Sequence, residues 1–341
     1  MKSFKLIGFA LAAFSCMQFA AAQEAAATTK LSAVVQLPGG KTEMLELERA
    51  DGEGTFYYID KGTAQLMTAM ASTCKTFYIQ TPNDMANALR DFYGNELAAA
   101  RKGFAAVKKK YAAFAGLPGS PCTMAALHEI TCAVRLLDVA GVKSLTAAFP
   151  GEKSLTGTDA ARLAAARVVA LISDKPDSFA AIKAAVENLM KDKKLSRELD
   201  SESYGWLRYA LGRAAAAMVP AEQVQATIAE DKVKAASVAV DFYCEAIMSM
   251  HGSHKEMPAD ALNRSLALLW AMPGVQEYAG KVQLPMTKPV WNAAPADFRD
   301  AVAMAHYIKA IYPAPAEAPN ALADKLDAYY FNMKKGAKAE K

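Results

Sequence analysis

The first part of the chain alternates apolar and polar residues at the period of a β-strand. The segments LSAVVQL (31–37), TEMLELERA (42–50), TFYYID (55–60) and KTFYI (75–79) are rich in β-forming residues, and the turn sequences PGGK and DGEG separate the first three. Residues 63–74 have no clear period. The pattern therefore predicts a small antiparallel β module over residues 31–80, either an open meander or a half-closed barrel.

After residue 80 the hydrophobic period lengthens to that of a helix. Thr81 followed by Pro82 predicts a helix start, with Thr81 as the cap and Pro82 in the first helical position. This helix reaches a break at Gly94, and a second one follows. We expect the apolar face of this second helix to be covered by neighbouring helices on both sides, because its alanines let those helices approach closely. That face consists of Leu97, Ala100, Phe104, Val107, Tyr111 and Phe114.

The same helical pattern continues to residue 333. After Ser120 and Pro121 start the next helix, about a dozen apolar-periodic segments follow one another, joined by short polar or Pro/Gly-rich connections. No strand pattern alternates with them, which excludes a parallel α/β sheet. We therefore predict a mainly α protein, in which an α-solenoid or compact helical array over residues 81–333 follows the β module.

The two ends of the chain have the composition of processing and tail segments. Lys2 and Lys5 precede an apolar run that ends in small residues at Ala20 and Ala22, as in a secretory signal peptide over residues 1–22. Lipid attachment at Cys16 is the alternative. Residues 23–30 form a linker, and the basic residues 334–341 form a tail. No later run has the roughly 20 apolar residues of a membrane span, so we expect an exported protein, periplasmic or secreted.

Charge and cysteine content narrow the function classes. Without Lys2 and Lys5 the chain keeps 37 of its 39 basic residues against 35 acidic ones, a balance that does not favour a nucleic-acid partner. The run of lysines at 108–110 is interpreted as a solvated helix face. Four cysteines remain, too few for a disulfide scaffold. Cys122 and Cys132 should lie on one helix about 15 Å apart, too far for a disulfide.

Two helices carry a recognisable repeat signature. Ala100, Phe104 and Val107 reproduce the spacing of the second helix of a tetratricopeptide repeat, and the segment AVDFYCEA repeats it at Ala239, Tyr243 and Ala246. The chain thus resembles tetratricopeptide-like helical repeat proteins over residues 81–312. Its layout, with the segment YAAFAGLPGSP, is similar to a functionally uncharacterised family of signal-peptide-bearing bacterial proteins with a small β module. The first-helix signature of the repeat is not met in the segment YGWLRYALGRA.

Residue types that bind metals occur in two short segments. His128 and Cys132 are four residues apart in HEITC and would share a helix face, and His251 and His254 occur together in HGSH. A zinc site needs three or four ligands, and neither segment marks a third. We therefore interpret Cys132 as a core residue and His128 as partly exposed, and we predict no metal or other cofactor.

Catalytic motifs are absent from the sequence. It contains no nucleophile elbow, phosphate-binding loop or dinucleotide-binding glycine motif. Two classes of function stay open: an exported non-enzymatic scaffold that binds a protein or peptide partner in the cell envelope, and a helical glycan-binding or glycan-active protein. The second would need two convergent carboxylates and exposed tryptophans. The sequence does not specify an oligomeric state.

The processing site gives a first testable prediction. Because Ala20 and Ala22 satisfy the small-residue requirement before the cut, we expect the exported chain to begin at Gln23. Intact-mass measurement of the exported protein checks this. A mass that includes residues 1–22, or a lipid on Cys16, would contradict it.

Overall fold

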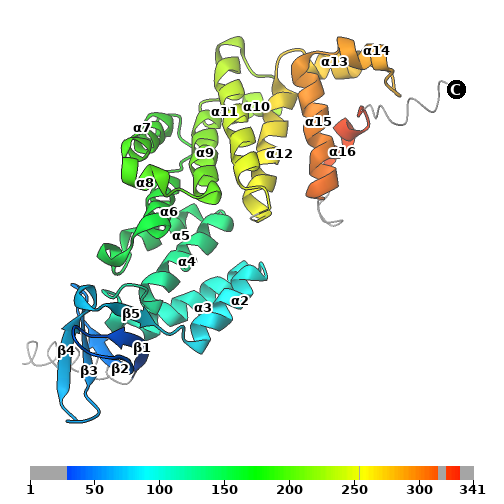
Figure 1. Cartoon of the computed structure of the whole chain (residues 1–341). Helices are drawn as coiled ribbons and strands as arrows, with labels where there is room; N and C mark the ends of the chain where they lie inside the picture. The colour runs from blue at the N-terminus through cyan, green and yellow to red at the C-terminus, as the bar shows by residue number, and fades with distance from the viewer. Residues whose placement is uncertain (1–28, 253, 314–319, 331–341) are drawn as a thin grey trace, which may run out of the picture. The chain divides into compact units, whose positions relative to one another are not determined.

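The computed structural model describes residues 29–252, 254–313 and 320–330. It shows a mainly helical protein in which a five-stranded antiparallel sheet precedes the helical array (Figure 1), as the sequence predicts. The chain divides into two compact units. Unit 1 comprises the residues up to Ala133 together with Ser144–Asp159, and unit 2 comprises Val134–Lys143 and the residues from Ala160 onward. The signal segment 1–22 and the tail 334–341 lie outside the described residues.

The sheet of unit 1 is a meander of four strands with a fifth strand returning to its start. Its strand order is β4-β3-β2-β1-β5, and all neighbours are antiparallel. Among the described residues no backbone pairing connects β4 to β5, so the sheet is open at that point. The strands are β1 (Leu31–Gln36), β2 (Thr42–Ala50), β3 (Thr55–Ile59), β4 (Leu66–Met70) and β5 (Thr76–Ile79).

The helices of unit 1 begin and end largely where the hydrophobic period places them. They are α2 (Asn83–Tyr93), α3 (Leu97–Lys110), α4 (Pro121–Arg135) and the last part of α5 (Val139–Ala147). Pro82 occupies the position before α2 and no side chain caps it, so the predicted Thr81 cap is wrong. By contrast, α4 starts at Pro121 as predicted, and the Ser120 hydroxyl accepts a hydrogen bond from the backbone N–H of Cys122.

Helix α3 packs between α2 and α4, as its two-sided apolar face predicts. All six residues of that face are buried, and the aromatic rings of Phe92, Phe104 and His128 join the three helices. A methyl group on Gly103 would lie 3.0 Å from Cβ of Ala88, which shows how closely α2 approaches. The buried residues of these helices form one hydrophobic cluster with the sheet, including Phe56. The β module and the first helices therefore share a core across residue 80.

Unit 2 is a series of helices in which each long helix packs against the preceding one. Helix α9 lies between α7 and α11, α12 follows α11, α15 packs on α12, and α16 on α15. The sequence pattern does not predict α8, α13 or α14. None of the described helices is long and apolar enough to cross a membrane. The helices are α6 (Gly157–Val169), α7 (Ser178–Lys191), α8 (Lys193–Arg197), α9 (Ser201–Ala216), α10 (Ala221–Gln225), α11 (Glu230–Ser249), α12 (Glu256–Ala271), α13 (Val275–Lys281), α14 (Lys288–Ala293), α15 (Ala296–Ile311) and α16 (Ala321–Asp327).

Small residues allow α9 and α11 to pack with almost no space between them. Gly212 of α9 faces Tyr243 of α11, and a methyl group on Gly212 would lie 2.7 Å from the ring carbon Cδ1. Gly205 faces Met250 in the same way, at 2.4 Å from Cγ. The repeat-signature residues Ala239, Tyr243 and Ala246 are all fully buried. The signature therefore marks the face of α11 that is covered by its neighbours.

This close packing gives a stability prediction. Gly212→Ala should lower the free energy of unfolding by about 1–3 kcal/mol, because the added methyl group overpacks the contact with Tyr243. Chemical denaturation checks this. Gly280→Ala is the matched control: nothing lies within 4 Å of its added methyl group, so it should be neutral or slightly stabilising. Equal effects of the two substitutions would contradict the packing argument.

Candidate functional site

The His128 and Cys132 pair does not form a site open to solvent. The His128 ring stacks on Phe104 with a centroid distance of 5.0 Å and is partly exposed, whereas Cys132 is fully buried in the core of unit 1. The adjacent Glu129 is buried, and its carboxylate lies 2.5 Å from Nζ of Lys108 on α3. Within the described ranges no group of three or more His, Cys, Asp or Glu side chains is arranged to hold a metal ion.

Burial also makes the cysteine thiols poor nucleophiles. It raises the pKa of Cys122 to about 11 and also raises the pKa values of Cys74 and Cys244, so these thiols are protonated at neutral pH. Cys122 and Cys132 lie on the single helix α4, as predicted, and no disulfide joins the cysteines in the part of the chain that the structure describes.

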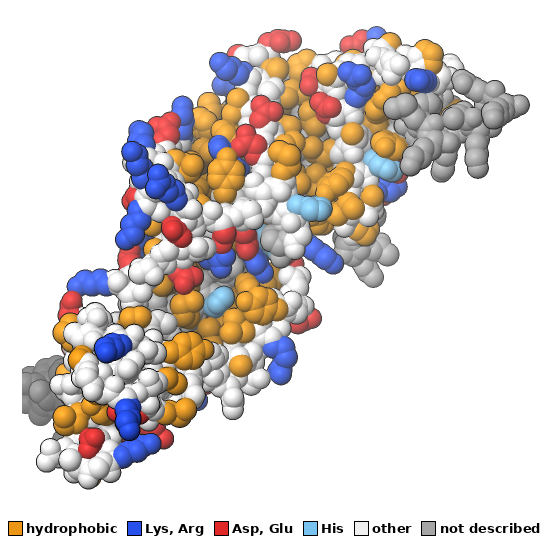
Figure 2. Space-filling view, viewed as in Figure 1, with side chains coloured by type: hydrophobic (Ala, Val, Ile, Leu, Met, Phe, Trp, Pro, Cys, Tyr) orange, Lys and Arg blue, Asp and Glu red, His pale blue; other side chains and the backbone are white. Residues whose placement is uncertain are grey.

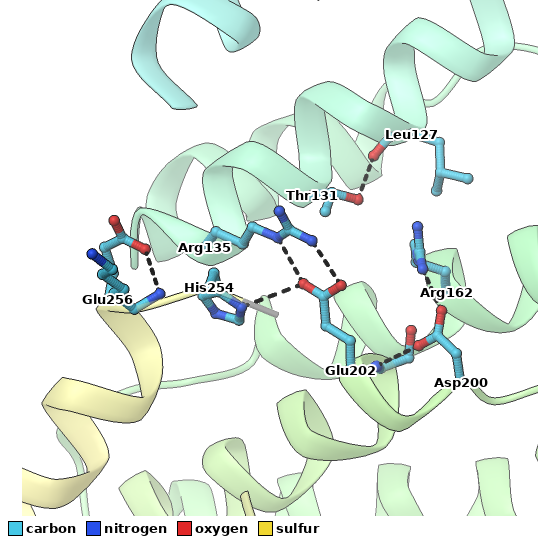
Figure 3. A network of polar contacts seen from close by, with 10 residues as sticks. Leu127, Thr131, Arg135, Arg162, Asp200, Glu202, His254 and Glu256 are labelled. Atoms are coloured by element: carbon cyan, nitrogen blue, oxygen red, sulfur yellow. Dashed lines mark hydrogen bonds and ion pairs between the residues drawn. The ribbon is translucent and has the colours of Figure 1, made fainter. Parts of the chain in front are cut away.

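The other predicted pair, His251 and His254, occupies two different environments. His251 is exposed in the turn after α11, whereas the side chain of His254 is completely buried. The Nδ1 atom of His254 lies 3.6 Å from a carboxylate oxygen of Glu202. His254 therefore belongs to an internal polar network (Figure 3), and the two histidines do not share one exposed site.

That network joins the last turn of α4 to the first turn of α9. The Arg135 guanidinium donates two hydrogen bonds to Glu202, of 2.7 and 2.9 Å, and both side chains are about one-tenth exposed (Figure 3). Nearby, Arg162 pairs with Asp200, which also caps α9 by accepting from the N–H of Ser203. Removal of one partner of such a buried pair lowers the free energy of unfolding by about 3–5 kcal/mol. These ion pairs connect α9 to α4 and α6, and we interpret the network as structural.

An apolar groove lies in unit 2 between α7, α9 and α11. We call it the α9 groove; its volume is about 550 Å³. Its hydrophobic lining consists of Phe179, Val186, Leu211, Ala215, Met218, Ala235, Val238 and Phe242, and its charged lining of Lys183, Glu187, Arg208, Asp231 and Lys234. Figure 2 shows this mixture of hydrophobic and charged side chains over α9 and α11.

One wall of the α9 groove is held rigidly by Arg208. Its guanidinium lies over the rings of Tyr204 and Phe242, at 4.7 and 5.8 Å from the ring centroids, and its Nε lies 2.9 Å from Glu245. Cation–π contacts and the ion pair therefore keep Phe242 in place at the edge of the groove.

A second hollow adjoins the groove at Met218, which lines both. We call it the arginine pocket. It has a volume of about 590 Å³, and Arg213, Arg264 and Asp174 line its charged side. Its remaining lining is small or apolar apart from Gln225: Pro176, Ala216, Ala217, Val219, Pro220, Ala221, Val224, Ala267 and Leu268.

Hydrogen bonds position both guanidinium groups of the arginine pocket. Arg213 donates to Asp174 at 2.6 Å and to the Tyr209 hydroxyl at 3.3 Å; Tyr209 and Arg264 both donate to Asp260, at 2.6 and 2.5 Å. Burial and the neighbouring Asp260 raise the pKa of Tyr209 to about 12. The hydrogen bond and charge of Arg213 lower the pKa of Asp174. At neutral pH the phenol of Tyr209 is therefore neutral and the carboxylate of Asp174 is charged.

The three tryptophans offer little exposed stacking surface for a sugar. Trp206 is completely buried, and Trp270 is half-buried under Lys325, whose Nζ lies 4.5 Å from the ring centroid. Trp291 is also half-buried and contacts Tyr330 edge-on.

No family model matches the chain, and neither a curated protein nor a solved structure matches it. The sequence pattern does not reveal the α9 groove, because its lining residues have the same helical spacing as core residues.

The buried His254 gives a prediction of pH dependence. Burial lowers the pKa of His254 from 6.5 to about 4, against the opposing charge of Glu202. The unfolded chain therefore binds a proton below pH 6.5 that the folded protein does not. Stability should accordingly fall as the pH decreases from about 6.5 towards 4, by about 3 kcal/mol from this group.

Two asparagine variants isolate this contribution. Urea unfolding at pH 7, 6, 5 and 4 should show a shallower loss of stability for His254→Asn than for the unmodified protein, because the variant lacks the titrating imidazole. His251→Asn, at an exposed position, should follow the unmodified protein. Parallel curves for His254→Asn and the unmodified protein would show that His254 does not cause the acid sensitivity.

Proposed function

We propose that this protein is an exported, non-enzymatic binding protein whose helical array holds a peptide segment of a protein partner in the α9 groove. The observation that carries the proposal is the groove itself, an apolar hollow walled by Phe179 and Phe242 and bordered by charges of both signs. Buried apolar anchors surrounded by a polar rim are typical of peptide-binding surfaces.

The shape of the two hollows favours an extended ligand over a small molecule. The α9 groove and the arginine pocket meet at Met218, which is 38% exposed, so a chain passing over this residue reaches both. Stacked helices present such continuous surfaces, and the resemblance to tetratricopeptide-like repeats supports the same class of function. Methionine adapts its shape to different ligands, which suits a surface that accepts a peptide.

The contacts of the carboxylates weigh against the glycan alternative. The buried Glu202 and the half-buried Asp200 are held by arginines, and Trp206 is fully buried. The two carboxylates that line the α9 groove each lie near a lysine, Glu187 4.0 Å from Lys183 and Asp231 3.5 Å from Lys232, and no tryptophan lines it. We therefore favour a peptide or protein partner in the cell envelope.

Obstruction of the groove tests the proposal. Peptides are first selected from a displayed library of random 12-residue sequences on the purified chain from Gln23 onward. They should bind the Ala235→Trp variant at least about tenfold more weakly than the unmodified chain, because the indole fills the hollow that holds the apolar anchor of the peptide. Fluorescence anisotropy with the labelled peptides measures this. Ser237→Trp introduces the same side chain at an exposed position of α11 outside the groove and should bind as the unmodified protein does.

Two results would contradict the proposed function. The selection could yield no peptide that binds the purified chain. Alternatively, the selected peptides could bind Ala235→Trp and Ser237→Trp equally well, which would place them outside the groove.

A further inference from the structure

The arginine pocket has hydrogen-bond donors that the protein itself does not use. Nε of Arg264 is bound by Asp260, whereas the terminal nitrogens of Arg264 make no hydrogen bond to any described residue. The Arg264 side chain is 38% exposed and lines the pocket. A guanidinium presents its N–H groups in a planar fork that matches the two oxygens of a carboxylate. The open side of Arg264 is therefore suited to an acidic group.

A second guanidinium strengthens the same preference. Arg213 is only 14% exposed, and its partner Asp174 is 85% exposed. The carboxylate of Asp174 is thus an exposed surface group that a ligand carboxylate can displace at modest cost. Burial lowers the pKa of Arg213, but Tyr209 and Asp174 more than offset this, so its net pKa is raised and it stays charged.

Cations are in slight excess among the side chains that line the two hollows. The arginine pocket has two cations, Arg213 and Arg264, and one anion, Asp174; the α9 groove has three lysine or arginine side chains and two carboxylates. Among the lining side chains of each hollow the cations therefore exceed the anions by one. Asp260 and Glu245, which are not part of the lining, pair with Arg264 and Arg208, so the preference for an acidic ligand depends on the N–H groups of Arg264 that these contacts leave open.

We infer that the arginine pocket binds an aspartate or glutamate side chain of the same peptide whose apolar residues fill the α9 groove. This inference rests on the proposed function and adds the ligand class: an acidic peptide with a bulky apolar anchor. Met218 lies between the two subsites, so the acidic residue and the anchor occur close together in the ligand sequence.

Matched peptides and variants test the acidic subsite. The peptides selected on the unmodified chain should contain a recurrent Asp or Glu near an apolar residue. Replacing that acidic residue by Asn or Gln should weaken binding of the peptide about tenfold. Arg264→Gln should weaken binding of the acidic peptide to a similar extent and leave binding of the Asn- or Gln-substituted peptide unchanged. Asp174→Asn, at an exposed position, should raise the affinity for the acidic peptide about threefold, because the competing carboxylate is removed.

The outcomes separate this inference from the proposed function. The inference is overturned, and the peptide-binding function stands, if the selected peptides bind Ala235→Trp more weakly but show no preference for acidic residues. Such peptides would bind Arg264→Gln and Asp174→Asn as they bind the unmodified chain. Peptides that ignore Ala235→Trp would overturn both. If Arg264→Gln does not fold, the Asp174→Asn variant still decides: unchanged affinity for the acidic peptide rejects the subsite.

Discussion

The close contact between α9 and α11 is the constraint on which the helical array of unit 2 depends. Gly205 and Gly212 bring the two helix backbones so near that Met250 and Tyr243 fill the contact completely. This approach fixes the rotation of α9 about its own axis. As a result Leu211, Ala215 and Met218 face the α9 groove, while Arg213 and its neighbours face the arginine pocket. A helix held less tightly would not present two chemically different hollows on adjacent faces.

Charged groups inside unit 2 act mainly as connectors between distant segments. Five buried or half-buried arginines of unit 2 have carboxylate partners, because an unpaired buried charge is very unfavourable. Four of the pairs join segments that are distant in sequence, so they specify alignment more than they add stability, whereas Arg264 pairs with Asp260 within α12. Arg264 differs because part of its guanidinium faces the arginine pocket. The pairs are Arg135 with Glu202, Arg162 with Asp200, Arg213 with Asp174, Arg208 with Glu245, and Arg264 with Asp260.

Local pattern predicted most of the secondary structure, and its failures have physical causes. The covered face of α3 was evident because six apolar residues recur at helical spacing and all six are buried, four of them in α3 and Tyr111 and Phe114 directly after it. Strand β4 was missed because it is an edge strand whose residues are mostly exposed, so burial imposes no alternation on LMTAM. The short helices α13 and α14 have too few residues to establish a period. The wrong Thr81 cap reflects a choice between adjacent starting positions that local sequence does not settle.

The sequence by itself determined which faces are apolar, where the longer helices and most strands occur, and which residues have metal-binding chemistry. It could not determine whether an apolar face becomes core or groove, since both have the same spacing. That distinction depends on which neighbour covers the face: α11 covers Gly212, whereas Phe179, Val238 and Phe242 stay half-buried around a hollow. The pairing of His254 with Glu202, 52 positions away, likewise required the fold, because residues that far apart in sequence meet only through tertiary packing.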